Sequence, residues 1–260
     1  KFIWQDFIIR LSLKLKIKFL REGYHLICNS EYTKKLLLET SKIPNQKMEV
    51  FGLPVNCSKF RPDNILRKTF REEYKIQPSE VVLLFVSNFT SIKQPGLAKK
   101  VAEKILHKYS HVKIAFIGRS VDNEILDHII ENKNRIIRVN EVNHETLNGF
   151  YNMADVLFST SKHETFGYTL AEGMATGKPT VAIPSGAQLE YMKHEYNALL
   201  SHPFEDFVES LSRLIENPSL RKKLGDNARL VINKKYSMDA YGSRLSKIFC
   251  KIEKYEDTRT

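Results

Sequence analysis

The residues of this sequence that are best suited to chemistry are two carboxylates eight positions apart, Glu164 and Glu172, with Gly167 between them. Helical spacing begins near Gly167, so the amides of a helix N-terminus are expected beside Glu164. Such amides carry a partial positive charge that suits a phosphate group, and a residue without a Cβ lets an anion approach the backbone closely. We therefore predict an anion site formed by the backbone of Phe166, Gly167, Tyr168 and Thr169.

The elements around this stretch have the pattern of a βαβ unit. An apolar strand is predicted at 155–159, a helix begins near Gly167, and a second strand follows at 180–183. Consecutive parallel strands joined by a helix place such a turn at the carboxyl edge of the sheet, where open α/β sheets bind ligands. Glu172 lies one to two turns into the helix. We expect it on a different side from the buried face, where it could reach a ribose diol.

The rest of the chain alternates strand and helix in the same way. Further strands are predicted at 81–87, 112–118 and 135–139, and the alternation repeats at least five times between Val81 and Asn217. This predicts an α/β fold with a Rossmann-like, doubly wound parallel sheet. The other predicted strands are 25–29, 48–52 and 197–200, and the predicted helices are 2–21, 31–41, 67–74, 95–108, 122–132, 147–154, 203–216, 220–234 and 240–256.

The acidic stretch resembles the donor-site motif of family-4 retaining glycosyltransferases of the GT-B fold. The E-x7-E spacing is filled from Glu164 to Glu172 and is followed by Gly-Met-Ala-Thr-Gly-Lys-Pro, and the resemblance runs from about His25 to the C-terminus. It implies transfer of a sugar from a nucleotide-diphosphate donor to an acceptor hydroxyl, with retention, in the synthesis of surface glycans, polysaccharides or glycolipids. It also implies that neither a metal nor another cofactor is required.

The resemblance also implies roles for individual residues. Glu164 would orient sugar hydroxyls near the reacting carbon, and Lys93 would clamp the diphosphate, which makes these two the expected catalytic residues. Asn88 stands where the family usually has an arginine, so Arg119 is a candidate replacement cation. The donor-binding set implied is Asn88, Lys93, Gly118, Arg119, Phe166, Gly167, Tyr168, Thr169 and Glu172. In contrast, His144, in the predicted cap of the helix at 147–154, is expected to be a surface residue.

The expected domain organisation also follows from the resemblance. Residues 1–64 would be a remnant of an N-terminal acceptor-side lobe, 78–235 the donor domain, and 236–260 a C-terminal helix that crosses back to the first lobe. The chain starts at Lys1 rather than Met, which suggests an N-terminally truncated piece. The helix predicted at 2–21 is basic and amphipathic, so it could lie on an anionic membrane or pack within a lobe.

Composition narrows the function classes. The 260 residues carry a formal charge of +11 and a pI near 9.4, which favours anionic partners but is equally produced by solvated lysines. No nucleic-acid module is recognisable. Three separated cysteines indicate a reducing compartment, and we expect a cytoplasmic protein with peripheral contact at the inner face of the membrane. Its expected partners are a nucleotide sugar and a glycan or lipid-linked acceptor.

Two other functions stay open at this point. A catalytically silent nucleotide-binding module is compatible with Asn88 in place of an arginine. A nucleotide-sugar epimerase of GT-B architecture is also compatible with the fold, although the sequence from His163 to Pro179 favours a transferase.

Overall fold

The computed structural model describes residues 26–41, 44–45, 48–119, 134–202 and 204–257. By its contacts the chain divides into two compact units. Pro54–Ala240 forms the larger unit, and the described residues up to Leu53 together with those from Tyr241 onward form the smaller one. The helices predicted at 2–21 and 122–132 lie outside the described residues. Within the described ranges, every helix is too short or too polar to span a bilayer.

The larger unit contains a six-stranded sheet in which every pair of neighbours is parallel. Its strands are β3 (Val81–Val86), β4 (Val112–Ile117), β5 (Ile136–Val139), β6 (Val156–Ser159), β7 (Thr180–Ala182) and β8 (Leu199–Leu200). All of β4 and all but the last residue of β3 are buried, as expected for strands covered on both faces. The predicted doubly wound parallel sheet is therefore confirmed.

The strand order locates the ligand edge. The order is β5-β4-β3-β6-β7-β8, so the chain moves outward from β3 in one direction and then returns to build β6 on its other side. Open α/β sheets bind ligands outside the carboxyl ends of the strands at such a reversal. The loops that follow β3 and β6, at 87–94 and 160–167, lie at this point.

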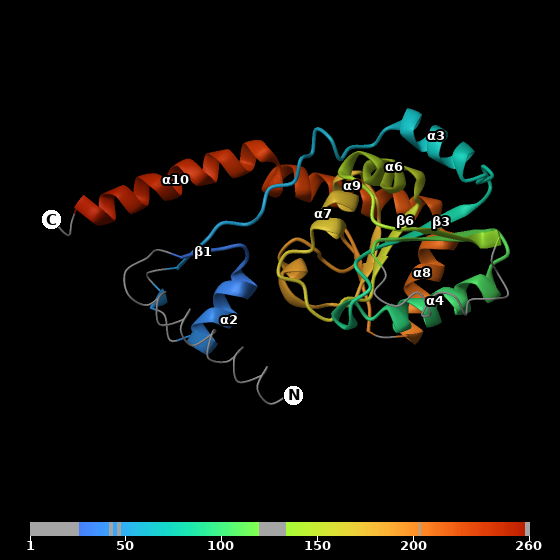
Figure 1. The fold of residues 1–260 in the computed structure, drawn as a ribbon, viewed down its shortest axis with the longest axis horizontal. Helices are drawn as coiled ribbons and strands as arrows, with labels where there is room; N and C mark the ends of the chain where they lie inside the picture. Colours follow the sequence, from blue (N-terminus) through green and yellow to red (C-terminus); the bar gives the residue numbers. More distant parts are fainter. Residues whose placement is uncertain (1–25, 42–43, 46–47, 120–133, 203, 258–260) are drawn as a thin grey trace. The chain divides into compact units, whose positions relative to one another are not determined.

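Helices cover both faces of the sheet (Figure 1). α4 (Pro95–Lys108) and α8 (Glu205–Glu216) pack on one face, over a core that includes Phe85 of β3 and Phe116 of β4. The other helices of the unit are α3 (Asn64–Glu73), α6 (His144–Met153), α7 (Tyr168–Ala175) and α9 (Pro218–Tyr236). Among these, α3 packs on α6, and α7 packs on β6 and α9.

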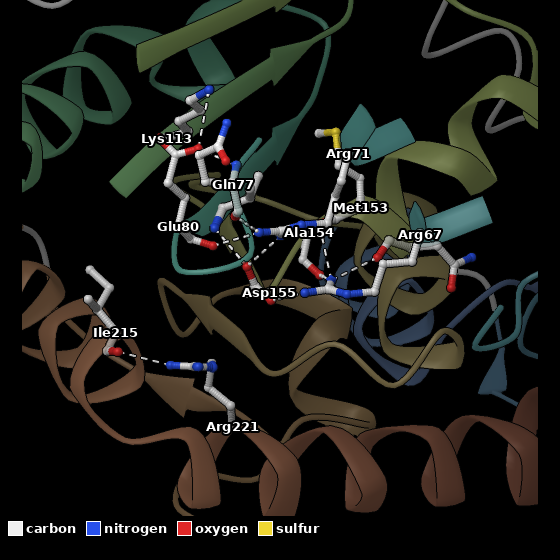
Figure 2. Close-up of polar contacts among 12 residues, drawn as sticks. Arg67, Arg71, Gln77, Glu80, Lys113, Met153, Ala154, Asp155, Ile215 and Arg221 are labelled. Carbon is white, nitrogen blue, oxygen red and sulfur yellow. Dashed lines mark hydrogen bonds and ion pairs between the residues drawn. The ribbon is translucent and has the colours of Figure 1, made fainter. Parts of the chain in front are cut away.

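A partly buried charge network fastens α3 to the end of the sheet opposite the ligand edge (Figure 2). Asp155, directly before β6, accepts from Arg67 at 2.6 Å and from Arg71 at 3.2 Å, and it also accepts from the amide of Val82 at 2.8 Å. Arg67 further donates to three carbonyls at the end of α6, those of Asn152, Met153 and Ala154. The arginines thus cap the C-terminus of α6 and fix where β6 begins.

The smaller unit holds a two-stranded parallel sheet, β1 (Leu26–Cys28) and β2 (Met48–Val50), with α2 (Glu31–Ser41) between the strands. Cys28 and Met48 form its buried cluster. The Ser30 hydroxyl caps α2 by accepting from the amide of Thr33 at 3.0 Å. α10 (Met238–Asp257) contributes Tyr241, whose ring centroid is 4.2 Å from that of Phe51.

Most predicted elements agree with the structure, and two helices begin earlier than their predicted bounds. The cap predicted around His144 is confirmed, since Asn143 accepts from the amides of Glu145 and Thr146, and α6 begins at His144 rather than at 147. α3 begins at Asn64 rather than at 67, because Asp63 accepts from the amides of Ile65 and Leu66. In both cases the polar cap starts the helix before apolar periodicity appears.

Candidate active site

The two residues expected to be catalytic meet at the strand-order reversal. Lys93 ends the short 3-10 helix η2 (Ser91–Lys93) after β3, and Glu164 lies in the loop after β6. Their side chains form an ion pair with 2.5 Å between Nζ and Oε1, and they are 27% and 10% exposed. The two loops are joined by backbone too, since the amide of Lys162 donates to the carbonyl of Ile92 at 2.9 Å. A cation and a carboxylate are therefore held together at the ligand edge.

A third loop holds the backbone of Glu164 in place. The amide of Ala187, in the 3-10 helix η4 (Gly186–Glu190), donates to the carbonyl of Glu164 at 2.7 Å. Gly186 has φ +59°, and a Cβ at this position would lie 2.2 Å from that same carbonyl oxygen. Only glycine allows this approach, so the loop after β7 positions the carboxylate that follows β6.

The turn at Gly167 has the conformation that the sequence predicts. Gly167 is left-handed, with φ +84°, and α7 begins at the next residue, so the first-turn amides face the ligand edge. The Tyr191 hydroxyl donates to the carbonyls of Phe166 at 2.8 Å and Gly167 at 3.1 Å. Burial raises the pKa of Tyr191 well above its usual value, with Glu164 adding to the effect, so this hydroxyl stays a donor. Phe166 itself is buried, whereas Tyr168 is exposed.

Glu172 is buried, which corrects the expectation that it lies away from the covered side of its helix. Its side chain is 6% exposed because α6 covers it, and Tyr151 donates to its Oε2 at 3.1 Å. Burial raises the pKa of Glu172 to about 7, against the opposing effects of the Tyr151 hydrogen bond and the Lys59 charge. Its other oxygen, Oε1, is 3.6 Å from Nδ1 of His144. Near neutral pH this carboxyl group is poised between its two protonation states.

The remaining expected donor-binding residues lie at the ends of β3 and β4. Asn88 is exposed just after β3. Gly118 allows β4 to end against Ser87, whose carbonyl oxygen would be 1.9 Å from a Cβ there. The carbonyl of Arg119 accepts from the amide of Phe89 at 2.9 Å. The exposed guanidinium of Arg119 pairs with Glu141 through both Nε and NH2, so a carboxylate already offsets the charge of this candidate cation.

Four residues of the site were not found from the sequence: His144, Tyr151, Gly186 and Tyr191. Each contacts a predicted residue across 20 or more positions of sequence, or from a different loop. A tyrosine in an apolar helix gives no sign that its hydroxyl will meet a carboxylate. Gly186 follows Pro184 and Ser185, a sequence typical of a turn, and such a sequence does not indicate a contact with Glu164.

Comparisons with known proteins find glycosyltransferases. A family model described as "Glycosyl transferases group 1" matches residues 67–231. The uncharacterized glycosyltransferase MJ1607 of Methanocaldococcus jannaschii is 25% identical over 225 residues, which are 84% of this chain and 57% of that protein. The chain thus spans a little over half the length of that relative.

Solved structures agree in fold. A glycosyltransferase from Rickettsia africae ESF-5 superposes with a TM-score of 0.80 at 22% identity, covering 92% of this chain and 67% of that one. Anabaena HepE, solved in complex with UDP and glucose, superposes with a TM-score of 0.80 at 16% identity, with the same coverage of both chains.

Proposed function

Because the chain belongs to the glycosyl transferases group 1 family, we propose that it forms the donor-binding part of a retaining glycosyltransferase. The intact enzyme would move a sugar from a nucleotide diphosphate to a hydroxyl acceptor. The decisive observation is the 2.5 Å contact between Lys93 and Glu164 at the strand-order reversal, beside the first turn of α7. This arrangement offers positive charge for a diphosphate and a carboxylate for the sugar within one small volume.

The chemistry of transfer assigns work to each of these groups. As the bond between the sugar and the diphosphate breaks, negative charge grows on the leaving group, and Lys93 with the α7 amides would stabilise it. The anomeric carbon becomes oxocarbenium-like, so a carboxylate that orients the sugar favours the transition state. The amide of Ala187 holds the backbone carbonyl of Glu164, and the side chain of Glu164 would keep the sugar correctly oriented. Glu172, about one turn along α7, would hold the ribose.

Binding of the diphosphate would change the surroundings of the ion pair between Lys93 and Glu164. In the free protein the ammonium of Lys93 is neutralised by Glu164. A bound diphosphate adds at least two negative charges, so Lys93 would sit between the carboxylate and the phosphate oxygens. The pair then places the cation before the donor arrives, which lowers the cost of organising the site.

For the donor, we favour a uridine diphosphate sugar as the first to be tested, since Anabaena HepE was solved with UDP and glucose. For the acceptor, we propose a glycan or a lipid-linked hydroxyl in surface polysaccharide or glycolipid synthesis. We also propose a cytoplasmic protein in peripheral contact with the inner face of an anionic membrane, a surface with which the net charge of +11 is compatible.

A transfer assay on the intact protein tests the assignment. Glu164→Gln should reduce kcat by about 100-fold or more while changing the Kd of the donor by less than about 3-fold, because its interaction is strongest in the transition state. Glu172→Ala should instead raise the Kd of the donor by about 10-fold, the size expected for a hydrogen bond to a charged group. The matched control is Glu209→Gln, on the exposed side of α8.

Full transfer by both variants would overturn the assignment. Nucleotide binding without transfer to any of a varied set of acceptors would favour the silent module. Release of an epimerised sugar would favour the epimerase.

A further inference from the structure

The carboxylate of Glu172 has one oxygen hydrogen-bonded to a buried tyrosine and the other beside an exposed histidine. Oε2 accepts the Tyr151 hydroxyl at 3.1 Å, deep between α6 and α7. Oε1 lies 3.6 Å from Nδ1 of His144, a residue whose side chain is 73% exposed. A ligand that binds this carboxylate from the solvent must therefore use Oε1, and it meets the imidazole of His144 as it does so.

The helix start and an aromatic contact hold the imidazole of His144 beside Glu172. His144 is the first residue of α6, a helix start fixed by Asn143. Its ring stands edge-on to the buried ring of Phe60, with centroids 6.2 Å apart. Phe60 also packs edge-on against Tyr151, with centroids 5.8 Å apart. One buried aromatic side chain thus supports both neighbours of the Glu172 carboxylate.

The spacing leaves both polar atoms available to a third group. A separation of 3.6 Å between Nδ1 and Oε1 is longer than a hydrogen bond, so neither atom satisfies the other. A neutral imidazole nitrogen can donate or accept, and a carboxylate oxygen accepts. Two adjacent hydroxyl groups are the simplest ligand that could bond to both atoms at once.

We propose that His144 is a specificity-determining residue that, together with Glu172, grips the cis diol of the donor's ribose. Oε1 of Glu172 accepts a hydrogen bond from one hydroxyl, and Nδ1 of His144 forms a hydrogen bond with the other. This proposal deepens the proposed function and rests on it, since it takes Glu172 as the ribose-binding residue. It gives the site a means of distinguishing ribonucleotide donors from their deoxy counterparts.

Calorimetric titration of the intact protein with UDP, GDP and ADP, and with the 2′-deoxy and 3′-deoxy forms of each, tests the proposal. For whichever nucleotide binds, removing either hydroxyl should weaken binding to the wild type by roughly 3- to 10-fold, the range for one hydrogen bond. His144→Ala should weaken binding of the parent nucleotide by a similar factor and abolish the penalty for one of the two deoxy forms. His144→Asn, which keeps a polar atom near the place of Nδ1, should recover part of both effects.

The control variant is His107→Ala, an exposed histidine on α4, which packs on the face of the sheet opposite α7. Its titrations should match those of the wild type. If nucleotides bind and His144→Ala leaves both deoxy penalties intact, the role of His144 is overturned while the proposed function stands. If no nucleotide binds to the wild type at all, the proposed function fails, and this role fails with it.

Discussion

At the scale of single residues, Glu172 carries a conflict between stability and binding. Burial between α6 and α7 raises its pKa to about 7, so folding favours the protonated carboxyl group. An acceptor for ribose hydroxyls must instead be ionised. Between the unfolded pKa of about 4.5 and the folded pKa of about 7, the folded protein holds more protons at Glu172 than the unfolded chain does. The stability contributed by this group therefore falls as the pH rises through that range.

Glu172→Gln should therefore stabilise the protein at high pH and not at low pH. The amide cannot ionise and can still accept from Tyr151, so at pH 8 the free energy of unfolding should rise by about 1–3 kcal/mol. At pH 4.5 the variant and the wild type should differ little. Thermal unfolding of both proteins at the two pH values measures this. Equal gains in Tm at pH 4.5 and pH 8 would show that ionisation of Glu172 is not the cause, and the exposed Glu209→Gln should change neither value.

The residues that could be predicted from the sequence are those whose position along a strand or helix dictates their place. Lys93 and Glu164 follow two strands, so the sheet brings their loops to one edge whatever the details of packing. The burial of Glu172 could not be predicted, because it depends on which helix covers α7. His144 was expected at the surface, and its exposure agrees with that, but its contact with Glu172 depends on how α6 packs.

At the scale of elements, the start of β6 is set by charges at the opposite edge from the site. Arg67 and Arg71 of α3 converge on Asp155, and Lys178 joins them by donating to the carbonyl of Asn152 at 3.2 Å (Figure 2 for the arginines). Burial lowers the pKa of Lys178 to about 8, and the nearby guanidinium of Arg67 adds to the effect. Asp155 is the carboxylate that offsets them.

Asp155→Asn should consequently destabilise the larger unit strongly. It removes the carboxylate that faces both arginines. Breaking a buried pair costs about 3–5 kcal/mol, and because the side chain of Arg67 is 34% exposed we expect a loss of about 2–3 kcal/mol here. Urea unfolding followed by circular dichroism measures the loss. Glu72→Gln removes the carboxylate of an exposed pair with Lys68, 3.9 Å apart, and should change stability by less than about 0.5 kcal/mol. Similar losses for both variants would contradict a special role for the network.

Helix boundaries were the weakest part of the prediction at this scale. The start of α3 was placed three residues late, because Asp63 acts through hydrogen bonds to backbone amides and leaves the apolar pattern unchanged. The cap of α6 at Asn143 was predicted, and the helix begins directly after it, three residues before the predicted apolar segment. The strands were predicted closely, since buried parallel strands are nearly continuous apolar runs. α4 matches its prediction from Pro95 to Lys108, where a proline at the first position marks the start.

At the scale of the whole molecule, alternation of strand and helix was enough to predict the doubly wound sheet. The order of its strands brings the loops after β3, β6 and β7 together, and three loops distant in sequence then build one site. The division into acceptor-side remnant, donor domain and crossing helix stays a prediction. The smaller unit has only two short strands of its own among the described residues, and two-stranded sheets are marginal by themselves.

The most direct test of the central claim is a crystal structure of the intact protein with UDP, GDP or ADP, whichever raises its unfolding temperature most. The account predicts the diphosphate within hydrogen-bond distance of the first-turn amides of α7 and of Lys93, with the ribose at Glu172. A nucleotide bound elsewhere, for example in the hollow of about 730 Å³ lined by Lys68, Arg71 and Lys75 beside α3, would contradict it.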